Sequence, residues 1–185
     1  MRTHVVFDND ITYELTEQAV TAFFGYTTAT GTSYRASVGA LLDGGLEPGA
    51  HDFDPGFVVA VGATHQWPFG DGQWFVAGSV GLSVARASTH MAGGGGDAHF
   101  TAGDARGGAI VGRTFGRIWN PYVLARGFGG PVWWTVDGEA VSGTDTRHFQ
   151  LGAGLSVSTP IGLTVNVDVS ALGEQAASLG ATWRL

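Results

Sequence analysis

The stretch Leu163–Ser170, which reads LTVNVDVS, decides the fold class. Every second residue in it is aliphatic, and every residue between is polar. A period of two places the two kinds of side chain on opposite faces of a β-strand. The stretch His148–Ser158 repeats the pattern, with Gly, Ser and Gln on its second face. The sequence therefore predicts strands with one apolar face and one face of small or polar residues.

Outward from this stretch, the same alternation continues along the chain and helical periodicity is nearly absent. Clusters of Gly, Pro and Asp separate the alternating segments, as expected at turns. Broken alternation at Gly107–Gly108 and Gly129–Pro131 suggests bulges. We predict ten strands, at residues 4–15, 18–29, 32–42, 56–67, 73–87, 105–115, 119–134, 146–158, 162–171 and 174–184. Leu15–Ala19 and Leu172–Ala176 resemble each other, and each predicts a tight turn beside a terminal strand.

Composition limits the class of protein. The 185 residues suit a single domain, 1–185, with 31 Gly, no Cys and only 14% charged residues. Hydrophobic residues make up 44%, yet no run approaches the ~18 apolar residues of a membrane helix. A net charge of −7 argues against a nucleic-acid partner. What remains is a globular β protein or a membrane barrel, whose apolar residues occupy alternate positions.

The second face of the strands favours the membrane barrel. In a soluble barrel this face would carry hydrated Lys, Glu and Arg, whereas here it is mostly Gly, Ala, Ser and Thr. Small residues suit the crowded lumen of a narrow barrel and leave the apolar face for lipid. A soluble, lipocalin-like barrel is the alternative.

The predicted connections alternate between short and long. Short turns near Gly31, Pro68–Gly72, Gly116 and Thr159–Ile161 alternate with long loops at Asp43–Asp54, Ser88–Asp104 and Asp137–Asp145. Outer-membrane barrels have short periplasmic turns and long external loops. Ten strands place both termini on the short-turn side, so we prefer ten to eight. The predicted fold is all-β: one closed antiparallel up-and-down transmembrane barrel.

Aromatic residues lie near the predicted ends of the strands. We expect a girdle beside the short turns, formed by Tyr26, Tyr34, Trp67, Trp74, Trp119, Tyr122 and Trp183. A second group lies towards the long loops, at Tyr13, Phe57, Trp133, Trp134 and Phe149. Two aromatic belts are typical of the two membrane–water interfaces.

The last strand brings a family resemblance. Ala177, Leu179, Ala181, Trp183 and Leu185 are apolar at alternate positions up to the last residue. This pattern resembles the C-terminal assembly signature of outer-membrane barrels, although Leu185 stands where an aromatic residue is usual. The plan of strands is similar to the small OmpA/OmpX/OmpW-type barrels. The resemblance implies an integral bacterial outer-membrane location, with the bilayer, lipopolysaccharide and the assembly machinery as partners, and no specific activity.

Charged residues within the strands predict a polar lumen. We expect inward charges to form a network that fills the barrel, from Asp8, Asp10, Glu14, Arg35, Arg126, Arg147, Asp168 and Arg184. Buried charges are costly unless paired. A charge-lined water path or ligand site is the alternative. We interpret the acidic external loops as a solvated rim, because their carboxylate residues have no spacing that defines a metal site.

A structural or surface-interaction role follows as the leading prediction, with a lumen filled by polar and charged side chains. A narrow porin-like channel for small solutes is the alternative, and an outer-membrane enzyme is third. His65 and His90 lie in no motif that would activate a Ser nucleophile, so we expect no enzyme and no cofactor. No signal peptide is visible before Val5. Either the protein is not exported, or this is a mature chain with a start Met.

Overall fold

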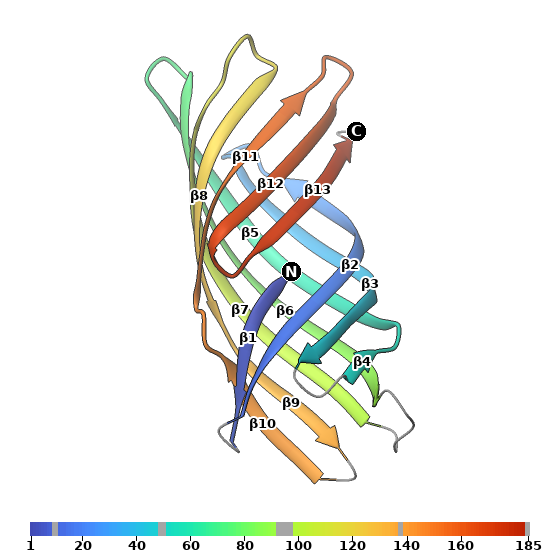
Figure 1. The fold of residues 1–185 in the computed structure, drawn as a ribbon. Coiled ribbons are helices and arrows are strands. Elements are labelled where there is room, and N and C mark those ends of the chain that lie inside the picture. The colour runs from blue at the N-terminus through green and yellow to red at the C-terminus, as the bar shows by residue number, and fades with distance from the viewer. Residues whose placement is uncertain (9–10, 48–50, 92–97, 137–138, 184–185) are drawn as a thin grey trace.

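The computed structural model describes residues 1–8, 11–47, 51–91, 98–136 and 139–183, and these form antiparallel strands (Figure 1). The strands are β1 (Arg2–Phe7), β2 (Thr12–Thr27), β3 (Thr32–Glu47), β4 (His51–Phe53), β5 (Gly56–Phe69), β6 (Trp74–Met91), β7 (Ala98–Arg113), β8 (Trp119–Gly129), β9 (Pro131–Val136), β10 (Glu139–Asp145), β11 (Phe149–Ser158), β12 (Leu163–Gly173) and β13 (Ala176–Trp183). The described residues contain no helix able to cross a membrane. The all-β prediction is confirmed.

The predicted strand count is wrong. The described residues hold thirteen strands, neither ten nor eight, because the predicted strand 119–134 divides into β8 and β9, and because β4 and β10 form where the sequence predicts long loops. β8 pairs with β7 as far as Gly129, and after Gly130 the chain continues as β9, which pairs with β7 and β10. A Cβ at Gly130 would lie 1.9 Å from the Gly103 carbonyl oxygen, so only Gly fits at this change of strand.

One end of the molecule is a closed ring, which we call the lower ring after its place in Figure 1. Its hydrogen-bonded neighbours follow the order β1, β2, β3, β4, β6, β7, β9 and β10, and β10 returns to β1 through Val5↔Asp145. The short β4 joins β3 to β6 at this end. Higher up, β5 takes that place through its ladders with both strands.

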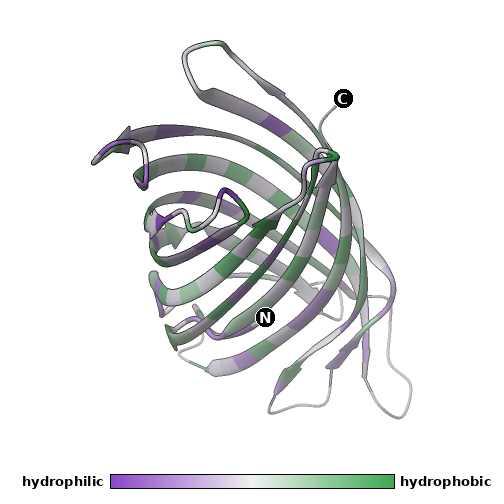
Figure 2. Cartoon of the chain, turned by 90° about the horizontal axis from the view of Figure 1, so that it is seen from above, coloured by the Kyte–Doolittle hydropathy of each residue, from purple (hydrophilic) through white to green (hydrophobic). Residues whose placement is uncertain are grey.

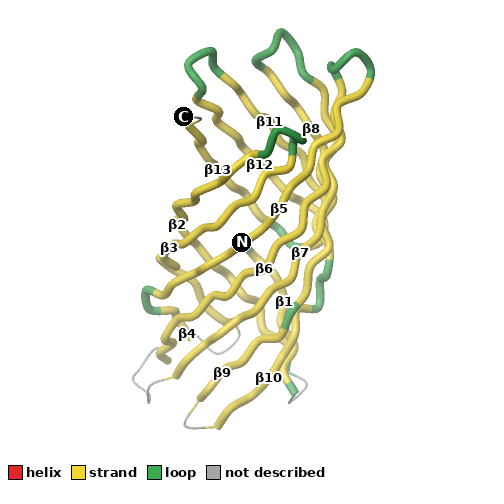
Figure 3. The backbone as a smooth tube through the Cα atoms, turned by 180° about the vertical axis from the view of Figure 1, so that it is seen from behind, coloured by secondary structure: helices red, strands yellow, loops and turns green. Residues whose placement is uncertain are grey.

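The other end, the upper sheet, continues from β7 through β8, β11 and β12 to β13. It includes β5 and the upper parts of β2, β3, β6 and β7 (Figures 1 and 3). The ring of hydrogen-bonded strands is thus continuous in the lower ring. The upper sheet is open, and β13 and β2 are its two edges. β12 and β13 reach only halfway down the molecule (Figure 1).

Short turns gather at the upper end, as the sequence predicts. Gly31, Gly70, Gly116 and Gly162 each have positive φ in these turns. The C-terminal strand also points to this end, whereas the N-terminus lies at mid-height (Figures 1 and 3). The turn at Leu172–Ala176 is confirmed, since β12 ends at Gly173 and β13 begins at Ala176.

The predicted turn at Leu15–Ala19 and the long loops are wrong. β2 runs through Leu15–Ala19 without interruption, because Leu15 is buried in the interior. β3 extends to Glu47, β6 to Met91 and β10 from Glu139, so most of the described residues of the predicted long loops lengthen the lower ring, while residues 48–50, 92–97 and 137–138 lie outside the described part of the chain.

The interior of the lower ring is apolar. A cluster of buried side chains fills it, drawn from all of its strands except β10: Val5, Phe7, Leu15, Leu41, Leu46, Phe53, Ala87, Phe100, Val132 and Trp134. Leu46 and Phe100 are completely buried. Trp134 lies at the centre, with ring centroids 5.6 Å from Phe7 and 4.6 Å from His51.

In the upper sheet the polarity of the two faces is reversed. The exposed positions alternate with small residues and are aliphatic or aromatic, including Val20, Phe24, Val38, Val59, Val61, Val80, Leu82, Val84, Val123, Leu151, Val167, Val169 and Leu179. Along β6, Val80, Leu82 and Val84 are exposed, while Ala87 and Thr89 further down are buried. Figure 2 shows the resulting alternation of hydrophobic and hydrophilic bands along the strands.

Candidate functional site

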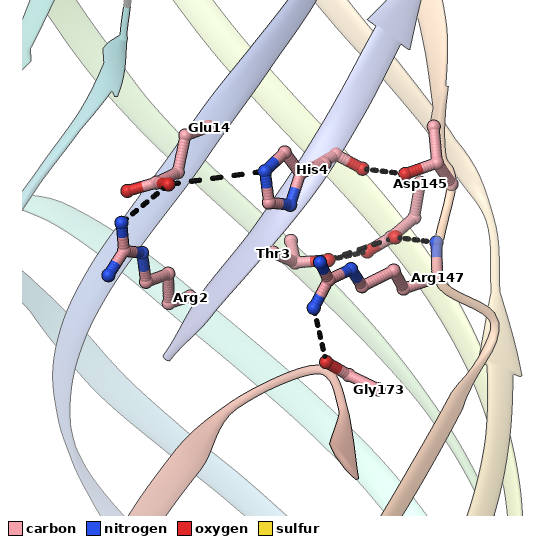
Figure 4. Close-up of polar contacts among 8 residues, drawn as sticks. Arg2, Thr3, His4, Glu14, Asp145, Arg147 and Gly173 are labelled. Carbon is pink, nitrogen blue, oxygen red and sulfur yellow. Dashed lines mark hydrogen bonds and ion pairs between the residues drawn. The ribbon is translucent and has the colours of Figure 1, made fainter. Parts of the chain in front are cut away.

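Polar residues tie the start of β1 to distant strands at the waist, where the lower ring meets the upper sheet (Figure 4). The Thr3 hydroxyl, 1% exposed, lies 2.9 Å from both carboxylate oxygens of Asp145. Arg147 donates its backbone N–H to Asp145 at 2.7 Å and its guanidinium to the Gly173 carbonyl at 2.9 Å. Arg2 pairs with Glu14 at 2.7 Å. The N-terminal strand, β10 and the β12–β13 turn are therefore fastened together.

Above the waist, a second group of polar side chains lies inside the upper sheet. The Tyr122 hydroxyl donates to Asp168 at 2.6 Å, and Ser178 donates to the other Asp168 oxygen at 3.1 Å. β13 lies beside β12, where Ser178 is the register partner of Asp168, whereas β11 separates β8 from β12. The Tyr122 side chain passes over Gly154 of β11 to reach Asp168, on the face opposite the exposed Val167 and Val169. Asp168 thus connects three strands.

A neighbouring chain of hydrogen bonds joins Arg126, Gln150 and Glu174. Arg126 donates to the Gln150 side chain at 3.1 Å, and the Gln150 amide donates to Glu174 at 3.3 Å. Gln150 and Glu174 are 1% and 2% exposed, which in a single-layer ring requires that they point inward. Arg126 is also close enough to Asp168 and Arg106 to interact with them electrostatically.

Asp104 and Arg106 add an ion pair on β7, with Nε 3.1 Å from the carboxylate. The guanidinium of Arg106 also lies 5.1 Å from the centroid of the Phe128 ring. The sequence does not predict this pair, nor the contact between Gln150 and Glu174. The signal for Asp104, Arg106 and Gln150 is their alternation with outward residues, but the sequence predicts a loop at Asp104. We call Tyr122, Arg126, Gln150, Asp168 and Glu174, with the Asp104–Arg106 pair, the interior polar cluster.

The other predicted lumen charges are spread over the molecule. Asp8 is exposed and accepts a hydrogen bond from Ser142, while Arg35 stacks over Phe23 with 5.2 Å to the ring centroid. Within the described residues, Arg126 is close enough to Asp168 and Arg35 to interact with them electrostatically, and Glu14, which pairs with exposed Arg2, interacts in the same way with Arg147 at the waist. Asp10 and Arg184 lie outside the described residues.

The predicted aromatic girdle separates into two groups. Six of its members are at least 41% exposed: Tyr26, Tyr34, Trp67, Trp74, Trp119 and Trp183. They lie beside the short turns of the upper end or close to the end of β13. Tyr122 differs from them, because its hydroxyl belongs to the interior polar cluster.

A cavity of about 390 Å³ opens beside the waist, between β2, β3 and β4. Polar residues line most of it, among them Glu17, Asp43, Glu47 and Asp52. Among the described residues, no group of three or more His, Asp or Glu is placed to hold a metal ion. The cavity therefore has acidic walls without a defined ligand set.

Comparison of the chain with known protein families, with curated proteins and with solved structures finds no match in any of the three.

Proposed function

We propose that this chain is an integral β-barrel protein of a bacterial outer membrane, with a structural or surface-interaction role. The upper sheet crosses the bilayer, and the lower ring projects from the membrane on the cell-surface side. The observation that carries the proposal is the reversal of polarity between the two halves. Apolar side chains face outward in the upper sheet and inward in the lower ring.

The dimensions of the upper sheet support this location. β8, β11 and β12 have 11, 10 and 11 residues, and a membrane-crossing strand needs about 9–11 when tilted by about 45°. Exposed aromatic side chains lie at its upper end, and Phe57 and Trp133 are exposed near its lower boundary. Aliphatic residues lie between. Aromatic girdles around an apolar band are typical of such barrels.

A change from apolar to polar outward residues on β6 supports a lower boundary of the membrane at this level. Below the exposed Val84, the next outward residues are Arg86, Ser88 and His90, and His90 lies 3.3 Å from Asp54, which follows β4. Charged and ionisable groups in these positions suit water or lipid headgroups, and the apolar interior beneath them is the ordinary arrangement of a protein in water. The lower ring is then the part available to extracellular partners.

The same core favours the structural role over a solute channel. Phe100, Leu46 and Trp134 fill the interior of the lower ring, so a path through the upper sheet would end on closely packed apolar side chains. The interior polar cluster above them stiffens the membrane part by joining strands across the lumen. Lipopolysaccharide and the outer-membrane assembly machinery are the partners that this location implies.

Two measurements test the proposal. The purified chain is expected to stay folded in detergent micelles or lipid vesicles and to aggregate when the detergent is removed. A chain that remains folded and monomeric in buffer alone would refute the membrane location.

Conductance in a planar bilayer separates the two roles. The intact chain is expected to insert without ohmic steps. Stable steps from the intact chain would refute the closed lower ring and favour the narrow channel.

A further inference from the structure

A seam separates the two edge strands of the upper sheet. Beyond Thr16, β2 has a ladder with β3 alone, and β13 has a ladder with β12 alone. Within the described residues no ladder joins β2 to β13. Below the seam lies the start of β1 (Figure 1). An open sheet edge leaves backbone N–H and C=O groups without partners, in water as in lipid, and so can pair with a further strand.

The first rungs of a strand in this seam already exist. On one side of β1, Met1 accepts a hydrogen bond from the Glu17 N–H at 3.0 Å, and its ammonium donates to the Glu17 carbonyl at 2.7 Å. On the other side, Arg2 and Gln175 exchange antiparallel hydrogen bonds of 2.8 and 3.1 Å. β1 therefore ends upward with a ladder to β2 on one side and a single bridge to Gln175, the residue ahead of β13, on the other.

The backbone groups above these rungs point into the seam. Along a strand, successive residues direct their N–H and C=O groups to alternate neighbours. Glu17 and Gln175 face the seam, so the same holds for every second residue above them. These are Ala19, Thr21, Phe23 and Gly25 on β2, and Ala177, Leu179 and Ala181 on β13. Among the described residues their seam-facing groups have no hydrogen-bond partner.

At each level of the seam, the side chains on the β2 edge and on the β13 edge point to the same side of the sheet. Counted upward from Arg2, the rungs set Val20 level with Leu179, Ala22 with Ala181 and Phe24 with Trp183. All six are apolar and exposed. The rungs between set Ala19 level with Ser178, Thr21 with Gly180 and Phe23 with Thr182. A single strand between the edges would thus meet apolar partners outside and mostly small partners inside.

We propose that the seam is a strand-acceptor site, which takes one extended polypeptide segment as the upward continuation of β1. The segment runs antiparallel to both β2 and β13. It needs about eight residues, since a strand advances roughly 3.3 Å per residue and the β13 edge ends at Trp183. Apolar side chains alternate in it with Gly, Ser or Thr, beginning with an outward residue directly ahead of Met1. This proposal does not depend on the membrane location.

A disulfide tests the register. Eight residues of this pattern are placed ahead of Met1, with Cys as the third residue ahead of it and Val20→Cys on β2. The two Cα atoms of such a non-hydrogen-bonded pair lie about 4.5 Å apart, within the range that a disulfide spans. The chain has no other Cys, so this pair reacts alone. Rapid formation of the intramolecular disulfide is expected. With Cys moved to the second residue ahead of Met1, which faces inward, at least tenfold slower formation is expected.

Hydrogen exchange provides the second measurement. In the chain without the added segment, the amides of Ala19, Thr21, Leu179 and Ala181 are expected to exchange quickly, and with the segment at least tenfold more slowly. The matched control carries the same eight residues with the alternation shifted by one position, so that apolar side chains face inward, and is expected to protect these amides little. Absence of the disulfide, equal rates for both Cys positions or unchanged exchange would overturn the proposal and leave the seam to lipid or water.

Discussion

Replacing Val167 by Arg gives the sharpest test of the proposal that the upper sheet faces lipid. Val167 lies on the outer face of β12, 44% exposed, between Leu155 of β11 and Leu179 of β13. In a soluble protein this would be a surface substitution, with an effect within about 0.5 kcal/mol. In a bilayer the same side chain would bring a guanidinium into hydrocarbon.

The depth of Val167 follows from its strand. Leu163 pairs with Trp183 at the upper aromatic level, and Leu172 marks the lower end of the apolar face of β12. The nine steps between them span about 30 Å along the strand, or about 23 Å along the membrane normal at a tilt of roughly 40°. Val167 is four steps from Leu163, so in the proposed membrane it would lie about 10 Å deep and close to the midplane. Arg at the midplane costs about 2–4 kcal/mol.

The assay is reversible urea unfolding of the chain in lipid vesicles, followed by tryptophan fluorescence. Val167→Arg is expected to lower the free energy of unfolding by about 2–4 kcal/mol. Ser156→Thr, on the inner face of neighbouring β11, serves as the control and is expected to have a far smaller effect. Equal stability of Val167→Arg and the unchanged chain would refute the assignment of this face to lipid.

Three further substitutions test the interior and the backbone by the same unfolding measurement. Trp134→Ala is expected to cost about 3–5 kcal/mol, because the side chain is 4% exposed at the centre of the lower ring; a loss below about 1 kcal/mol would contradict a close-packed core. Tyr122→Phe removes the 2.6 Å hydrogen bond to Asp168 and is expected to cost about 1.5–3 kcal/mol, whereas an unchanged midpoint would place Asp168 in water. Gly130→Ala is expected to cost about 1–3 kcal/mol, while Gly107→Ala, whose Cβ would have its nearest neighbour at 3.8 Å, changes little; equal effects would contradict the close approach at Gly130.

The sequence predicted best where one pattern continued without interruption. In β11 and β12 the predicted faces match the observed ones, from Gln150 inward to Val167 outward. The apolar positions change phase partway along β2, since Tyr13 and Leu15 are odd-numbered and pack inside, whereas Val20 and Phe24 are even-numbered and lie outside. The sequence thus contains an apolar face in each half of the strand, but a period of two does not say which face turns inward.

The site was harder to predict than the strands. The positions of Asp168 and Arg126 among outward residues predict that both point inward, but their partners depend on the order of the strands: Gln150 lies on the strand next to Arg126, and Tyr122 lies two strands from Asp168. Tyr122 was grouped with the interfacial aromatics because ring chemistry alone does not distinguish a girdle from an interior hydroxyl. The β2 turn was misplaced because Glu17 and Gln18 looked like turn residues, although the buried Leu15 beside them holds the strand in place.

The waist contacts have a consequence for the order of folding. The bond between Thr3 and Asp145 closes a loop of 142 residues, and the rung between Arg2 and Gln175 closes a longer one. Hairpins along the chain need only local pairing. β1 pairs with β2 on one side, and its other neighbour is β10, so this second pairing can form only after β10 has been made. Since non-local pairing slows folding, closure of the lower ring is the late step, and it depends on the first and last parts of the chain together. In a nascent chain that ends before β10, the edge of β1 that normally pairs with β10 would be exposed, and it could pair with the wrong strand or with another chain.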